Sequence, residues 1–134
     1  MKYLLAFLIV YGQCIIGNVS GGQTNHLQVW NDLDVTVYVH CKSGSSDIKG
    51  AYKRPGQLYP FPVRDNFWKT TLFWCTVRQG PDWKRGRKFD VYEYEKGVPQ
   101  GGTYIWRAKK DGIYFELKNR KPLHKVWDWQ ILPL

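Results

Sequence analysis

Apolar and polar positions alternate along several short runs of this chain, with the period of two that β-strands show. The clearest run is Thr70–Val77, reading TTLFWCTV, in which Thr71, Phe73, Cys75 and Val77 share one face. The positions between them are also bulky, aromatic or β-branched. We therefore expect a central strand here that is buried on both of its faces.

A second alternating run, Val35–Cys41, places three valines and Cys41 on a common face. If the two strands lie near each other, Cys41 and Cys75 can form a disulfide in the core. The third cysteine, Cys14, lies in the N-terminal leader, so these two are the only cysteines expected in the mature protein. Two cysteines so far apart match no zinc-binding spacing, and no metal site is expected.

The remaining sequence consists of short extended segments separated by turn residues. These segments are 27–30, 57–63, 89–94, 103–109, 113–118 and 125–130. Pro60 and Pro62 lack the N–H that a central strand needs, so their segment is expected at a sheet edge. Asp111 and Gly112 suit a type I′ hairpin turn. About seven or eight short strands at this spacing favour an all-β fold, a small antiparallel β-sandwich with a disulfide.

The N-terminus indicates export from the cell. Lys2 precedes an apolar run, 3–10, that is too short to span a membrane and is followed by small residues. We expect a signal peptide at 1–20 and a secreted, extracellular domain at 21–134. An amphipathic N-terminal helix is the alternative.

The charge balance is basic. The 134 residues hold 20 Lys and Arg against 11 Asp and Glu, which gives a formal charge of +9. Such a balance favours an anionic partner, for example an acidic protein surface or an acidic glycan, but it also suits plain solubility. With 43% hydrophobic residues, the chain has enough apolar side chains to build a core.

Several motifs occur together in an order that resembles one known family. They are VWNDLDVTVYVHCKS, a Gly-Gln-Leu-Tyr-Pro-Phe segment, TLFWC, FDVYEYE and WRAKKDGIYF, within about 27–115. In order and spacing they are similar to the plant self-incompatibility proteins, the S-protein homologues. The resemblance implies a small, basic, secreted β-sandwich held by disulfides. It also implies a ligand for a cell-surface receptor, in pollen–pistil recognition or in other cell–cell signalling.

The chain departs from that family pattern in two places. Family members often carry a second cysteine pair shortly before and at the last hairpin, where this chain reads GVPQGGTYIW. The loop after the HCKS element is usually more acidic, whereas here Asp47 is its one carboxylate. Both departures indicate a diverged homologue, and they leave a role in pollen rejection open.

The titratable residues show no pattern typical of an enzyme. Acid–base catalysis of the nuclease type needs two histidines near a cation, and the spacing of His26, His40 and His124 does not bring any two together. His40 and Cys41 are adjacent in a strand and so point to opposite faces, which excludes a thiol–imidazole pair. We expect no catalytic residue and no cofactor.

We expect recognition to reside in the loops, because the strands use their side chains in the core. The densest positive charge lies in the predicted loop 79–88, which also carries an exposed indole. Its candidate contact residues are Trp83, Lys84, Arg85, Arg87 and Lys88. An indole among cations suits phosphate or sulfate contacts with stacking. A solvated loop without a partner is the alternative.

A second candidate is the polar loop 42–50, with Lys42, Ser43 and Asp47 as its contact residues. The expected partner is a cell-surface protein or an acidic glycan, and neither nucleic acid binding nor membrane insertion is expected of this monomer. The alternative function is that of a secreted defence protein which binds carbohydrate or an anionic surface. Trp127 and Trp129 lie on one predicted strand face, where they close the core or, alternatively, form a carbohydrate-stacking platform.

Overall fold

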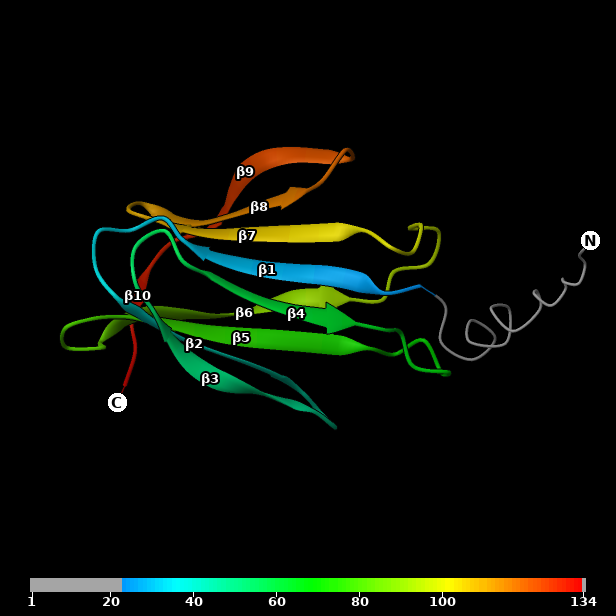
Figure 1. Cartoon of the computed structure of the whole chain (residues 1–134), viewed down its shortest axis with the longest axis horizontal. Helices are drawn as coiled ribbons and strands as arrows, with labels where there is room; N and C mark the ends of the chain where they lie inside the picture. Colours follow the sequence, from blue (N-terminus) through cyan, green and yellow to red (C-terminus); the bar gives the residue numbers. More distant parts are fainter. Residues whose placement is uncertain (1–22, 134) are drawn as a thin grey trace, which may run out of the picture.

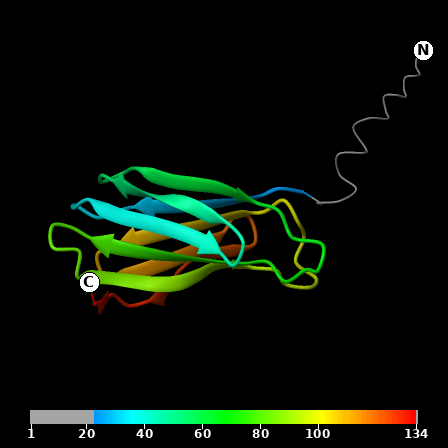
Figure 2. The same cartoon turned by 90° about the horizontal axis from the view of Figure 1, so that it is seen from below.

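The computed structural model describes residues 23–133, so the predicted signal peptide lies outside the described residues. Within them the fold is all-β, a sandwich of two five-stranded sheets (Figures 1 and 2). The strands are β1 (Asn25–Asn31), β2 (Val37–Ser43), β3 (Asp47–Lys53), β4 (Leu58–Val63), β5 (Leu72–Gln79), β6 (Arg85–Glu93), β7 (Thr103–Lys109), β8 (Gly112–Leu117), β9 (Lys121–Trp127) and β10 (Gln130–Ile131). The predicted β-sandwich is confirmed.

One sheet has the strand order β4-β1-β7-β8-β9, and the other has the order β10-β6-β5-β2-β3. Neighbouring strands are antiparallel except β1 and β7, which run parallel. The sandwich is therefore mixed and not wholly antiparallel. The physical reason is that the chain passes through most of the second sheet between β1 and β7, and such a long connection places no constraint on strand direction.

The core lies between the sheets and is filled by side chains that point inward from both of them. They include Leu27, Val29, Val37, Val39, Phe73, Val77, Phe89, Val91, Trp106 and Ile113. On β5 the inward residues are buried as expected, but Leu72, Trp74 and Thr76 are only half-buried. Burial on both faces was therefore a wrong prediction for β5, because residues 23–133 place no second layer over the outer face of its sheet.

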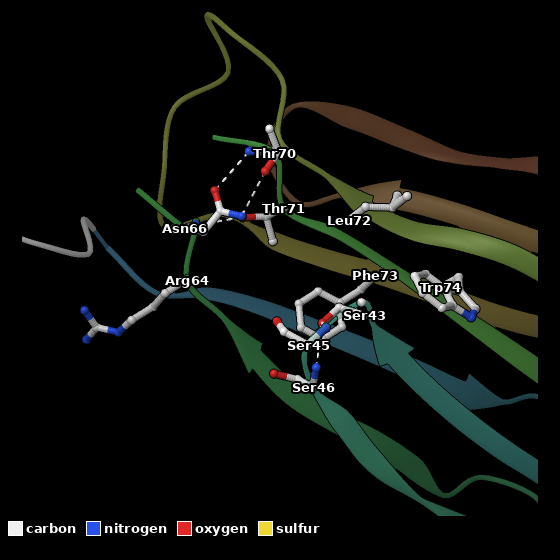
Figure 3. A pocket seen from close by; sticks show the side chains of 11 residues that line it. Ser43, Ser45, Ser46, Arg64, Asn66, Thr70, Thr71, Leu72, Phe73 and Trp74 are labelled. Atoms are coloured by element: carbon white, nitrogen blue, oxygen red, sulfur yellow. Dashed lines mark hydrogen bonds between the residues drawn. The ribbon is translucent and has the colours of Figure 1, made fainter. Parts of the chain in front are cut away.

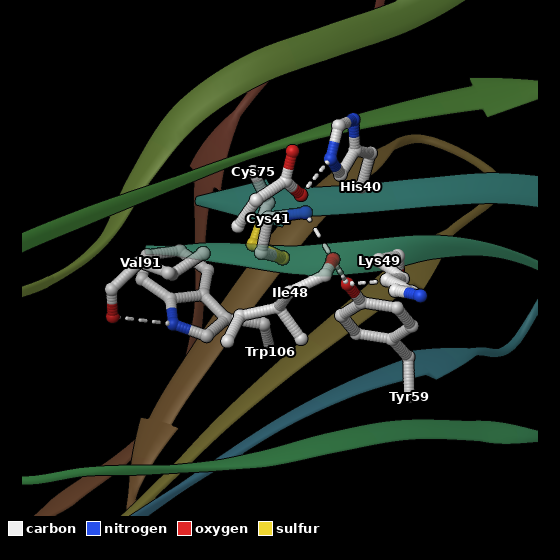
Figure 4. Close-up of a disulfide and its surroundings, with 9 residues drawn as sticks. His40, Cys41, Ile48, Lys49, Tyr59, Cys75, Val91 and Trp106 are labelled. Atoms are coloured by element: carbon white, nitrogen blue, oxygen red, sulfur yellow. Dashed lines mark hydrogen bonds and ion pairs between the residues drawn. A yellow bond between two sulfur atoms is a disulfide. The ribbon is translucent and has the colours of Figure 1, made fainter. Parts of the chain in front are cut away.

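The predicted disulfide is present and joins two neighbouring strands (Figure 4). Cys41 on β2 is the register partner of Cys75 on β5, and neither is exposed. Beside them, the Tyr59 hydroxyl of β4 accepts a hydrogen bond from the Cys41 N–H (3.3 Å) and donates to the Ile48 carbonyl (2.5 Å). Burial raises the pKa of Tyr59. The disulfide links two neighbouring strands of one sheet. The hydrogen bonds of Tyr59 connect β4 of the other sheet to the same region.

Over residues 23–133 the structure has ten strands, more than the seven or eight predicted, because the pattern missed β3 and the short β10 and because the predicted segment 125–130 is divided between β9 and β10. β3 covers most of the predicted loop 42–50 and pairs with β2, yet its side chains are exposed or half-buried. β9 pairs with β8 and is exposed throughout. An edge strand that buries no face needs no hydrophobic alternation, so its sequence resembles a loop. β4 is also an edge strand, as its prolines predict.

Candidate binding surface

Only half of the predicted basic loop 79–88 is a loop, the residues 80–84. β6 begins at Arg85, and Arg87 and Lys88 pair with Val77 and Thr76 of β5. The hydrophobic pattern missed this pairing because the first residues of β6 are cationic. What remains between β5 and β6 is a short hairpin connection that contains Trp83 and Lys84.

Trp83 is half-buried, where the sequence predicted an exposed indole. Its backbone has a φ of 65°, in the left-handed region that residues other than glycine seldom adopt. The Trp83 carbonyl accepts a hydrogen bond from the Arg78 guanidinium (2.9 Å), and the indole packs edge-on against Tyr52 of β3, with ring centres 5.4 Å apart. Lys84 beside it is exposed. The hairpin therefore presents its cation to solvent and holds its indole against β3.

Arg87 is held in the structure by the opposite sheet. Its guanidinium stacks on the indole of Trp127 in β9, 4.4 Å from the ring centre, and Nη1 donates to the Asp128 carbonyl at 3.4 Å. Trp129, two residues after Trp127, is buried and donates its indole N–H to the Lys109 carbonyl at 2.7 Å. Trp129 closes the sandwich, as predicted, whereas Trp127 is exposed and lies outside the core, so core closure was a wrong prediction for Trp127.

Lys42 and Lys88 each lie beside Trp74 on the outer face of the sheet that contains β2, β5 and β6. Trp74 of β5 is the register partner of Lys42, and the Lys88 ammonium lies 5.8 Å from the centre of the Trp74 ring. Both lysines are exposed and the indole is half-buried. On β6 the register partner of Trp74 is Asp90, so the half-exposed indole has two lysines and one carboxylate beside it, and it can contact polar groups of a partner or the face of another aromatic ring.

Ser43 and Asp47 belong to the tight connection between β2 and β3. The Ser43 hydroxyl accepts hydrogen bonds from the N–H groups of Ser45 (3.3 Å) and Ser46 (3.0 Å). Asp47 lies 2.5 Å from Nε2 of His40 on the outer face of β2. His40 thus points away from Cys41, as expected. These polar groups are engaged with one another, at the accessible tip of a hairpin.

The structure divides the predicted contact residues between two ends of one sheet. β2 pairs with β5 from Val37 opposite Gln79 to Ser43 opposite Phe73, so the β2–β3 connection and the β5–β6 hairpin lie at opposite ends. Of the predicted residues, Lys42 lies beside Ser43, and Lys88, opposite Thr76 of β5, lies nearer the middle of the sheet. Lys84 lies in the β5–β6 hairpin at one end of the sheet, and Ser43 lies at the β2–β3 connection at the other end.

Sequence reasoning missed the segment 64–71, which connects β4 to β5. It carries Phe67 and Trp68, two large apolar side chains that are mostly exposed. Beside it lies an open hollow of about 480 Å³, lined among others by Ser43, Thr71 and Trp74 (Figure 3). Two adjacent aromatics outside any alternating run were the available signal, because nothing in a strand pattern accounts for them.

The pKa values of two neighbouring phenols, the buried Tyr92 and the half-buried Tyr104, are raised. Burial, and then the hydrogen bond that Tyr92 donates to Asp65 (2.7 Å), raise the pKa of the Tyr92 phenol well above its ordinary value. Burial likewise raises the pKa of Tyr104, which packs edge-on against Tyr92. Both phenols line the interior and support the fold.

Residues 23–133 contain no group of three or more His, Cys, Asp or Glu arranged to hold a metal ion. In the same range, no helix is both long and apolar enough to cross a membrane. His124 lies at β9 and its ring contacts Phe115, whereas His40 lies on the outer face of the other sheet. The two histidines are therefore not brought together.

Comparison with known proteins gives one consistent result. The sequence model described as plant self-incompatibility protein S1 matches residues 26–129. The chain is 37% identical over 132 residues to S-protein homolog 21 of Arabidopsis thaliana, covering 95% of this chain and 98% of that protein. It is 33% identical over 138 residues to S-protein homolog 17 of the same plant, covering 96% and 98%.

Among solved structures, a similar fold belongs to a self-incompatibility protein homologue. That structure is described as representing a widespread family of small, highly stable, secreted proteins from plants. It matches with a TM-score of 0.68 at 22% identity, covering 81% of this chain and 96% of the other. At this identity the likeness speaks for the shared fold alone.

Proposed function

This chain belongs to the plant self-incompatibility protein S1 family, and we propose that it is a small, basic, secreted ligand that binds a protein on a cell surface. Such a ligand would serve cell–cell recognition, either between pollen and pistil or in another signalling process. Secretion is supported by the apolar N-terminal run, by the disulfide, which persists in oxidising compartments, and by the description of the solved homologue as secreted.

The observation that carries the proposal is the half-exposed Trp74 with the exposed Lys42, Lys88 and Asp90 beside it, on a sheet face that the described part of the chain leaves uncovered. The inward side chains of the same strands fill the core and form the disulfide, so recognition is left to the outer face and the connections between strands. Cations on an exposed surface favour an acidic partner and accelerate encounter with it. The Lys84 hairpin extends this basic surface.

The test measures how fast the oxidised, fluorescently labelled domain associates with plant protoplasts at several salt concentrations. One variant removes three exposed cations of the hairpin and β6. It carries Lys84→Ser, Arg85→Ser and Lys88→Ser, and it spares Arg87 because that side chain packs on Trp127. A control with the same net charge removes three exposed cations elsewhere. It carries Lys110→Ser, Lys118→Ser and Lys121→Ser.

We expect saturable binding that protease treatment of the protoplasts abolishes. The first variant should associate more slowly and with a weaker salt dependence than the control, while both dissociate at the wild-type rate. Equal slowing in both variants would mean that net charge alone matters and would remove this surface from consideration. Binding that survives protease and is displaced by a free acidic oligosaccharide would instead support the carbohydrate-binding alternative.

A further inference from the structure

The segment 64–71 leaves two large aromatic side chains in water. Phe67 is 77% exposed and Trp68 is 76% exposed, and their rings lie edge to face with centres 5.0 Å apart. The described part of the chain places nothing over them. Exposed pairs of this size cost solubility and add nothing to the core, so they indicate a surface that another molecule covers.

The segment is held in one shape by hydrogen bonds around Asn66 (Figure 3). Its side-chain oxygen accepts from the Thr70 N–H (2.9 Å), its amide nitrogen donates to the Thr70 hydroxyl (3.1 Å), and its backbone N–H donates to the Thr71 hydroxyl (2.7 Å). The Lys69 N–H closes a turn on the Asn66 carbonyl at 3.1 Å. Phe67 and Trp68 lie inside this closed turn.

This rigidity matters for binding. Ordering a flexible loop opposes association, whereas a loop that is already ordered loses little freedom when it is bound. Lys69 has a φ of 58°, in the left-handed region, which the surrounding hydrogen bonds maintain. Thr71 connects the segment to the end of β6, because the N–H of Tyr94, the residue after β6, donates to the Thr71 carbonyl at 2.9 Å. The two aromatic rings are thus presented from a preorganised base.

We propose that Phe67 and Trp68 are the anchor of the interface with the cell-surface protein, and that they insert together into an apolar pocket of that partner. This inference rests on the proposed function and adds to it the residues that supply affinity. Aromatic residues in desolvated pockets dominate the energy of most interfaces, whereas rim charges act mainly on the association rate. The basic surface would steer the encounter, and the aromatic pair would slow dissociation.

The charges around the pair favour a protein over a lipid surface. Arg64 and Lys69 are the cations of the segment, and the Lys69 ammonium lies 5.6 Å from the Tyr94 ring, but carboxylates are close as well. Asp65 precedes the segment and accepts from Tyr92, and Glu93 is the register partner of Leu72, where the segment ends. An anionic bilayer would meet these carboxylates unfavourably, whereas a protein can place a carboxylate opposite Lys69 and a donor opposite the acids.

The test is competition on plant protoplasts that are saturated with the labelled wild-type domain. Unlabelled wild-type protein is compared with Phe67→Ser/Trp68→Ser and with the control Leu123→Ser/Ile131→Ser, which removes two exposed apolar side chains from other strands. We expect the Phe67→Ser/Trp68→Ser variant to need a concentration about 30-fold higher for half-maximal displacement, as for loss of a hot-spot contact. Its dissociation should be faster, and its melting temperature should match that of the wild type.

Each outcome decides between supporting and overturning the inference. If wild-type binding is saturable but the anchor variant competes as well as the control, the anchor is overturned while the proposed function stands. If protease treatment of the protoplasts does not reduce wild-type binding, both the aromatic anchor and the proposed function are overturned. Vesicles of phosphatidylcholine and phosphatidylserine provide the lipid arm: wild-type sedimentation that depends on Phe67 and Trp68 would overturn the protein pocket in favour of membrane insertion.

Discussion

Replacing both cysteines with alanine should cost a large part of the stability that a domain of this size has. Cys41 and Cys75 are 34 positions apart in sequence, and their bridge restricts the unfolded chain to a closed loop of that length. The chain-entropy relation for such a loop gives about 4 kcal/mol of stabilisation at 25 °C. Since small domains have about 5–15 kcal/mol in total, the variant should be marginally folded.

Urea unfolding at neutral pH, followed by tryptophan fluorescence, measures this difference as a lower midpoint. The single variants Cys41→Ala and Cys75→Ala sharpen the result, because either one already opens the loop. We therefore expect each single variant to lose nearly as much as the double variant, so that the two losses are far from additive. Losses below about 1 kcal/mol, or losses that simply add, would refute the loop-closure explanation.

Two further substitutions test interactions that the structure adds. Arg87→Ala should lower the unfolding free energy by about 1–2 kcal/mol, because its stack on Trp127 is lost. In the same urea assay, the control Lys88→Ala, at an exposed position on the same strand, should change that free energy by no more than about 0.5 kcal/mol. Equal effects of the two substitutions would contradict the structural role of Arg87. Tyr92→Phe should cost about 1–3 kcal/mol at neutral pH by removing the hydrogen bond to Asp65. The folded state raises the pKa of the Tyr92 phenol. The stability that the phenol contributes is therefore complete below its ordinary pKa near 10 and is lost as the pH rises through its pKa in the folded state. Above about pH 10, the Tyr92→Phe variant should therefore lose less stability than the wild type.

The features that sequence predicts here are those whose causes lie close together in the chain. Alternation along β5 identifies Phe73 and Val77 as core residues, and it is confirmed by their burial. The disulfide follows from there being two cysteines on inward faces of two strands. Pro60 and Pro62 place β4 at an edge because proline lacks a backbone donor. Each of these inferences needs only the local pattern and one physical rule.

The features that sequence does not predict depend on contacts between distant segments. Arg87 looks like one cation among several in a basic run, and only the folded structure places it on Trp127 of β9, in the opposite sheet. The half-burial of Trp83 depends in the same way on Tyr52 of β3. The exposure of Phe67 and Trp68 is equally a tertiary property, since an aromatic pair between two strands could as easily have folded into the core.

Recognition through the segment 64–71 is tested most directly by placing a photoreactive benzoylphenylalanine at position 68 in place of Trp68. Illumination of the labelled, oxidised domain on protoplasts should yield a covalent adduct with a protein, and excess unlabelled wild-type domain should prevent it. The same probe at Ile131, on the short edge strand β10, serves as the control and should give no such adduct. An adduct from position 131 with none from position 68 would contradict the aromatic anchor.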